Sequence, residues 1–257
     1  MQAGSSNPML NHGRFQEAEY SSPMRRGGVD SGKMTVSGAV DKTALTLVLA
    51  MTAAAFTWSQ VYTGAMAGAA VMTMTQVSGI VGIVVALGTM FMPHWSPVTA
   101  PVYAIAKGLA LGGMSAFMEL MYPGIVVQAL VATFGTLFAL LAAFKTKIIS
   151  VTEGFRSMVY MATGGFFLGM LAMMLLRLCG VPVPMASGPL ALGVGLVSTA
   201  LAAFNLLIDF DDIRSTAWQG APKWMEWYSA FSLLVTLVWM YTSILRVLSL
   251  LAGGRDD

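Results

Sequence analysis

Seven long runs of apolar residues follow one another along most of this chain. A helix needs about 20 residues to cross the roughly 30 Å hydrocarbon core of a bilayer, because it rises about 1.5 Å per residue. The runs have about this length and cover approximately residues 43–63, 67–92, 101–121, 124–144, 156–178, 189–209 and 227–250. They lack the in-and-out alternation of membrane barrel strands, so we expect an all-α integral membrane protein with seven transmembrane helices.

The composition excludes several other classes of protein. Hydrophobic residues make up 56% of the chain and charged residues only 10%, against about 25% in an ordinary soluble domain, which rules out a water-soluble globule. A net charge of +2 without a basic patch argues against nucleic-acid binding. Cys179 is the only cysteine, so an internal disulfide is excluded, and no CxxC pair suggests a redox or zinc site. The 21 methionines are scattered as packing residues, and no metal site and no cofactor are expected.

The first 42 residues are polar, rich in Ser, Gly and Pro, and lack the apolar segment of a signal peptide. We therefore divide the chain into a flexible cytoplasmic tail (1–42), a seven-helix transmembrane domain (43–252) and a short C-terminal tail (253–257). Cytoplasmic segments of membrane proteins are enriched in Lys and Arg, which predicts a cytoplasmic N-terminus and a C-terminus outside. The basic residues on the cytoplasmic side are then Arg14, Arg25, Arg26, Lys33, Lys42, Lys145, Lys147, Arg156, Arg214 and Lys223, against Arg177, Arg246 and Arg255 on the other side.

Ionisable side chains at membrane depth are costly and are therefore candidates for function. The densest group lies at the end of the sixth run, where Asn205, Asp209 and Asp212 follow at helical spacings of four and three and share one face. Asp211 adds a third carboxylate. Mutual repulsion and desolvation both disfavour full ionisation, which is typical of a proton-sensitive cation site. In the alternative interpretation, Asp211 and Asp212 simply start a solvated loop.

Lys107 lies within the third run and needs a partner for its charge. The expected topology places Asp209, Asp212 and Glu226 on the same side of the membrane, and we predict a contact between Lys107 and Asp209, with Glu226 as another possible ion-pair partner. Glu119 lies near the far end of the same run, close enough to the interface to be solvated.

Several motifs, in order along the seven runs, resemble those of the bacterial Bax inhibitor-like family of the TMBIM superfamily. They include Ala53-Ala54-Ala55-Phe56-Thr57-Trp58, Pro97-Val98-Thr99-Ala100-Pro101, Tyr122-Pro123-Gly124, Asp209-Phe210-Asp211-Asp212-Ile213 and Glu226-Trp227-Tyr228. The resemblance covers nearly the whole chain. It implies six helices around a central seventh, residence in a bacterial inner membrane and a proton-sensitive leak of calcium ions.

The resemblance also implies that an aspartate near the end of the sixth helix pairs with an acidic residue on the seventh, and that an arginine on the second helix locks the closed state. Asp209 matches the aspartate, but Ser243 takes the acidic position and the second run contains no arginine. A serine cannot share a proton with Asp209. Ser243 would also lie about 24 Å along a helix that starts near Trp227, too deep for a group at the level of Asp209.

Two functions from different classes remain open. The first is a pH-sensitive cation channel or exchanger, with calcium as the transported ion and Asp209 as its gate or binding carboxylate. The second is a membrane-embedded regulator that binds other membrane proteins, such as a quality-control protease. The acidic cluster favours the first, and the loss of an acid at Ser243 favours the second. An enzyme is not expected, because both histidines, His12 and His94, lie in the tail or in a loop.

Overall fold

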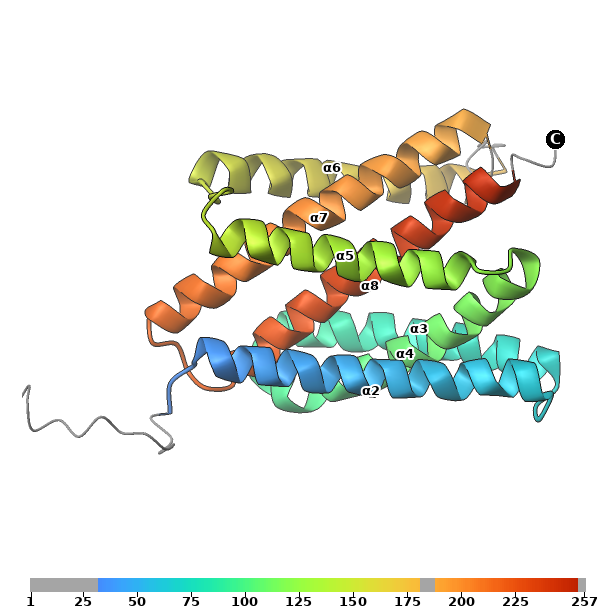
Figure 1. The fold of residues 1–257 in the computed structure, drawn as a ribbon, viewed down its shortest axis with the longest axis horizontal. Helices are drawn as coiled ribbons and strands as arrows, with labels where there is room; N and C mark the ends of the chain where they lie inside the picture. Colours follow the sequence, from blue (N-terminus) through green and yellow to red (C-terminus); the bar gives the residue numbers. More distant parts are fainter. Residues whose placement is uncertain (1–31, 181–187, 254–257) are drawn as a thin grey trace, which may run out of the picture. The chain divides into compact units, whose positions relative to one another are not determined.

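The computed structural model describes residues 32–180 and 188–253, which form an all-helical bundle (Figure 1). Seven of its helices are long and apolar enough to cross a membrane, which confirms the predicted fold class. The helices are α2 (Val36–Thr63), α3 (Gly68–Phe91), η2 (Pro93–Trp95), α4 (Ser96–Met121), α5 (Ile125–Lys145), α6 (Glu153–Leu178), α7 (Gly188–Trp218) and α8 (Met225–Gly253).

Several helices extend beyond the apolar runs. The first begins at Val36, because the Thr35 hydroxyl accepts a hydrogen bond from the Gly38 N–H and caps the helix. It therefore includes the last part of the segment 1–42 that we assigned to the tail; residues 1–31 and 254–257 lie outside the described residues. The helix α7 also extends beyond its apolar run and continues to Trp218. Asp211 and Asp212 therefore lie inside a helix, which rules out a loop at these positions.

Small residues set the close packing of three helices. Gly108 and Gly112 of α4 lie directly against the backbone of Ala50 and Ala54 of α2, so that a Cβ atom at either glycine would overlap it. The order of these contacts shows that α2 and α4 run in the same direction. The helix α3 runs antiparallel to them, with Gly79 beside Ala110. Close backbone approach at small residues is a common way for membrane helices to associate.

The helix α8 lies at the centre of the bundle. It makes extensive contact with α2, α4, α5 and α7, whereas α3 packs mainly on α4 and α6 on α7. A ring contact of 5.1 Å between the centroids of Phe167 and Trp239 links α6 to α8. Of the six helices expected around a central seventh, four therefore pack on it extensively and two lie further out.

The two ends of the bundle are distinguished by which connections they hold. At one end, called the proximal end here, the Met34 N–H donates to the Ala221 carbonyl at 2.7 Å, and the Ser96 hydroxyl donates to the Trp224 carbonyl at 3.1 Å. This end holds the start of α2 and the connections α3–α4, α5–α6 and α7–α8. The other end, called distal, holds the remaining connections and the end of α8, where Gly253 lies next to Tyr122.

Candidate functional site

Asp209 lies at the interface between α7 and α8 and is held there by two hydroxyl groups. The Ser232 hydroxyl donates to one carboxylate oxygen at 2.8 Å, and the Thr236 hydroxyl donates to the other at 2.6 Å. Asp209 is nine residues before the end of α7 and Ser232 seven residues after the start of α8, which corresponds to about 13 Å and 10 Å of helix. Because the two helices run antiparallel, the carboxylate and the hydroxyls lie at the same level.

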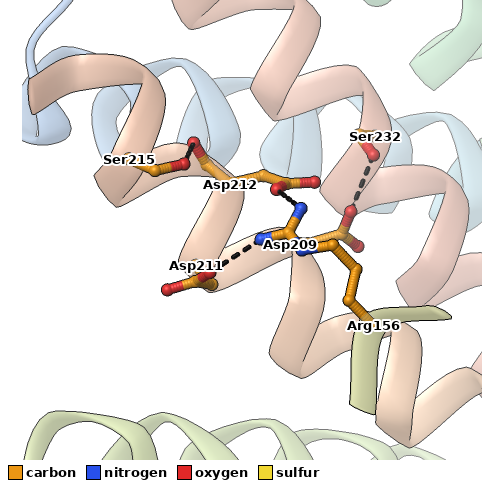
Figure 2. A network of polar contacts seen from close by, with 6 residues as sticks. All are labelled: Arg156, Asp209, Asp211, Asp212, Ser215 and Ser232. Atoms are coloured by element: carbon orange, nitrogen blue, oxygen red, sulfur yellow. Dashed lines mark hydrogen bonds and ion pairs between the residues drawn. The ribbon is translucent and has the colours of Figure 1, made fainter. Parts of the chain in front are cut away.

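Asp211 and Asp212 share one partner, Arg156, near the start of α6 (Figure 2). One guanidinium nitrogen lies 2.7 Å from the Asp211 carboxylate and another contacts the Asp212 carboxylate. The forked guanidinium can bind two acceptors at once, which offsets the repulsion between neighbouring carboxylates. The side chains of Arg156, Asp211 and Asp212 are 22%, 28% and 43% exposed, so solvent screens this network.

Asn205 does not join the carboxylates. Its side-chain amide donates to the Thr163 hydroxyl on α6 and to the Leu201 carbonyl, each at 2.8 Å. The cluster predicted from the sequence therefore divides by contact partner. Asp209 forms hydrogen bonds with α8, whereas Asn205, Asp211 and Asp212 contact α6. Arg156 also belongs to this site, but the sequence analysis used it only to predict the orientation of the chain in the membrane. Its position at the start of an apolar run, on the same side as the three aspartates, could have indicated that it pairs with Asp211 and Asp212.

Ser243 is buried in a separate polar group, further along α8. Its hydroxyl lies 2.7 Å from the Ser198 hydroxyl, which also accepts a hydrogen bond of 2.9 Å from the Trp239 indole. Ser243 follows Thr236 by seven residues, or about 10 Å of helix. Ser243 and Asp209 therefore do not pair, but their separation is smaller than the about 24 Å expected, because Asp209 lies level with Ser232 and Thr236 and not at the start of α8. The residues that face Asp209 are Ser232 and Thr236, which the sequence analysis missed. The two residues are four positions apart, so they share one face of the last helix near the level of Asp209, and this spacing could have indicated the contact.

Lys107 lies near the middle of α4, with its aliphatic stem against Gly82 of α3, where a Cβ atom would come within 2.9 Å of the lysine Cε. The expected contact between Lys107 and Asp209 is absent, since no ion pair joins Lys107 to any carboxylate among the described residues. The physical reason is the packing. Both α4 and α7 pack on α8, and they make no extensive contact with each other.

Two buried or half-buried glutamates stabilise helix starts. Glu226, only 3% exposed, accepts hydrogen bonds of 3.0 Å from the backbone N–H and the hydroxyl of Thr35, and so joins the N-termini of α8 and α2. Glu119 accepts hydrogen bonds from the N–H groups of Gly124 at 2.6 Å and Val126 at 3.0 Å, at the start of α5. A negative charge is favourable at a helix N-terminus. Glu226 is therefore a structural residue in this arrangement and not a partner of Lys107.

A second polar region lies on the distal half of the same α7–α8 interface. It is a cavity of about 570 Å³ between α4, α6, α7 and α8. Its polar lining residues are Ser198, Trp239, Thr242, Ser243, Arg246 and Ser249. In the described part of the chain, no group of three or more His, Cys, Asp or Glu side chains is placed to hold a metal ion.

Together, the seven spanning helices and the aspartate held between two of them define a multi-pass, all-helical membrane protein with a polar site inside its bundle. Residues 7–253 match the family described as Bax inhibitor 1 like, and the chain belongs to this family. Comparisons with curated proteins and with solved structures gave no match.

Proposed function

We propose that this protein is a pH-sensitive leak channel or exchanger for cations, with calcium as the transported ion and Asp209 as the carboxylate that binds it. The observation that carries the proposal is the placement of Asp209 between α7 and α8, opposite two hydroxyl groups. Hard cations such as calcium bind oxygen ligands, and the carboxylate and the two hydroxyls offer oxygens within one small region. An ionisable group at membrane depth inside a bundle is a typical feature of an ion or proton path.

The distal cavity supports a path along the same helix interface. Asp209 lies in the proximal half of the α7–α8 interface, and the cavity around Ser198 and Ser243 lies in the distal half. Between the two polar regions the interface contains Ala202, Leu206 and Met240, all 0% exposed. We infer that this apolar packing is the closed barrier, and that separation of α7 from α8 at this level would connect the two polar regions.

The proposed pH sensitivity rests on the surroundings of Asp209. The charged groups of the same site are Asp211 and Asp212 on α7 and Arg156 on α6, and Arg156 binds the two other aspartates. Asp209 is thus stabilised by neutral hydroxyls and has no cation within ion-pair distance among the described residues. Protonation would turn one of its oxygens into a donor and weaken the attachment to α8. In this proposal the proton acts on the hydrogen bonds that join α7 to α8.

We further propose a bacterial inner membrane as the location, with the proximal end of the bundle in the cytoplasm. Among the described residues, that end holds Lys33, Lys42, Lys145, Lys147, Arg156, Arg214 and Lys223, and the distal end holds Arg177 and Arg246. This asymmetry follows the positive-inside rule. The role is transport without covalent chemistry, and the protein is proposed not to be an enzyme.

A second role, as a regulator that binds other membrane proteins such as a quality-control protease, is favoured by the packing of α6. This helix makes its main contacts with α7, and Val159 is its only buried residue. Its free surface would be available to a partner helix. Cross-linking from Met161 and Leu168, which are 70% and 68% exposed, would test this role independently of ion flux.

The test of the leading proposal is calcium flux into liposomes that contain the purified protein and an internal calcium dye, measured from pH 5 to pH 8. Asp209→Asn keeps the shape of the side chain and removes its charge, and it should reduce the flux and flatten its pH dependence. Asp41→Asn is the matched control, because Asp41 is exposed on α2 and distant in sequence from the α7–α8 site. If Asp209→Asn matches the wild type at every pH, Asp209 does not have the proposed role.

A further inference from the structure

A deep apolar groove opens on the side of the bundle between α2 and α5. Its volume is about 420 Å³, within the range of small-molecule sites, and no charged side chain lines it. The helices α2 and α5 make no extensive contact with each other, and α4 and α8 form the floor. Because both walls are membrane-spanning helices, the groove opens toward the hydrocarbon of the bilayer.

The position of the groove corresponds to one leaflet. Along α2 it runs from Leu47 to Trp58, which is about 16 Å at 1.5 Å per residue. Half of a 30 Å hydrocarbon core is about 15 Å. On α5 it is lined by residues from Val126 to Phe134, in the first half of that helix, so the groove belongs mainly to the distal half of the bundle. At its distal end, Trp58 stacks on Tyr62 with ring centroids 5.2 Å apart, and aromatic residues of this type mark the level of the lipid headgroups.

The width of the groove selects among possible occupants. Spread over about 16 Å of length, the volume of the groove corresponds to an average cross-section of about 25 Å². A helix with its side chains is about 10–12 Å in diameter, which is a cross-section of about 80–110 Å². A second protein helix is therefore too wide to enter, and a single extended hydrocarbon chain fits.

The polar groups that line the groove do not oppose such an occupant. The Ser115 and Tyr241 hydroxyls form a hydrogen bond of 2.7 Å with each other, and the Thr133 hydroxyl donates to the Ala129 carbonyl at 2.7 Å. Each hydroxyl thus has a partner within the protein, and an apolar chain can cover it without leaving it unpaired.

We propose that this groove binds one acyl chain of a phospholipid from the distal leaflet. The chain enters beside Trp58 and extends along α2 and α5 to the level of Leu47, in contact with Leu237 and Tyr241 of the central helix α8. The bound chain takes the place of the missing contact between α2 and α5. This site is separate from Asp209 and does not depend on the proposed transport.

The test uses the full-length protein in liposomes of phosphatidylcholine that carries a photoactivatable diazirine on one acyl chain, followed by mass spectrometry of the adducts. Adducts on Leu111 and Val238, which are half-buried on the floor of the groove, should exceed those on Met161 and Leu168 of α6, which are exposed outside it. Leu130→Trp fills the groove and should reduce the groove adducts at least about fourfold, the change that corresponds to one buried CH₂ group. Val131→Trp is the matched control, since Val131 is 68% exposed and does not line the groove.

Equal adduct yields on α6 and in the groove would overturn the proposal, and so would a loss that is the same for Leu130→Trp and Val131→Trp. If Leu130→Trp fails to fold, as judged by its melting temperature, Ala55→Phe fills the same groove from α2. Asp209→Asn should leave the adducts unchanged, which separates this proposal from that of the ion path.

Discussion

The Thr236 hydroxyl of α8 donates a hydrogen bond of 2.6 Å to the Asp209 carboxylate of α7. Together with the bond from Ser232, it attaches the acidic end of α7 to the helix at the centre of the bundle. This attachment explains how Asp209 is accommodated although no described acidic or basic side chain pairs with it. It also makes Thr236 a more informative position for mutation than Ser243.

Thr236→Val should lower the free energy of unfolding by about 1.5–3 kcal/mol, the typical contribution of a hydrogen bond to a charged group. The two side chains have similar shapes, so the change removes mainly the hydroxyl. Thr236→Ser keeps a donor and should recover most of the loss. Thermal unfolding in detergent measures both. Thr242→Val is the control on the same helix, because among the described residues that hydroxyl donates only to the carbonyl of Trp239, one turn before it. Equal effects at the two threonines would contradict the prediction.

Arg156→Gln should weaken the attachment of α6 to α7. A double-mutant cycle with Asp211→Asn is expected to give a coupling of about 0.2–1 kcal/mol, because the partners are partly exposed and solvent screens the pair. The coupling should fall as salt is added. Arg214→Gln serves as the comparison, since Arg214 is exposed on the same helix as the aspartates. A coupling indistinguishable from zero at low salt would show that the Arg156 contact does not contribute to stability.

Gly112→Ala should destabilise the protein by about 1–3 kcal/mol, the usual cost of overpacking. The new Cβ atom would overlap the backbone of Ala54, which cannot move like the end of a side chain. Gly165→Ala on α6 meets open space, and it should leave stability unchanged or raise it by up to about 1 kcal/mol through better helix propensity. Melting temperatures of the two variants in the same detergent test this contrast. Similar melting temperatures would mean that α2 and α4 are less closely packed than described.

The orientation of the bundle can be tested with reporter fusions at the C-terminus. The seven candidate spans found among the described residues and the basic residues at the proximal end predict a C-terminus outside the cytoplasm. A C-terminal alkaline phosphatase should therefore be active, and a C-terminal green fluorescent protein should be dark. The reverse result would mean that the orientation is inverted or that one helix does not span the membrane.

The number and type of the helices could be predicted from the sequence, because they depend on local properties. In lipid each backbone N–H and C=O group must be satisfied within its own segment, so an apolar run of about 20 residues folds as a helix whatever surrounds it. The depth of Asp209 was not predictable in this way, because α7 continues nine residues past it to Trp218. Helix ends were less predictable, since polar residues such as Asp211 and Asp212 can continue a helix once a partner neutralises them.

The partners of the polar side chains were decided only by the tertiary structure. Whether Asp209 meets Thr236 or Ser243 depends on the register between α7 and α8, which the packing of Ala202, Leu206 and Met240 establishes. Lys107 lies against Gly82 instead of Asp209 because α4 and α7 pack on α8 and not on each other. A run of apolar residues specifies that a helix crosses the membrane, but the choice of neighbours depends on the fit of many side chains from distant segments, which no local pattern contains.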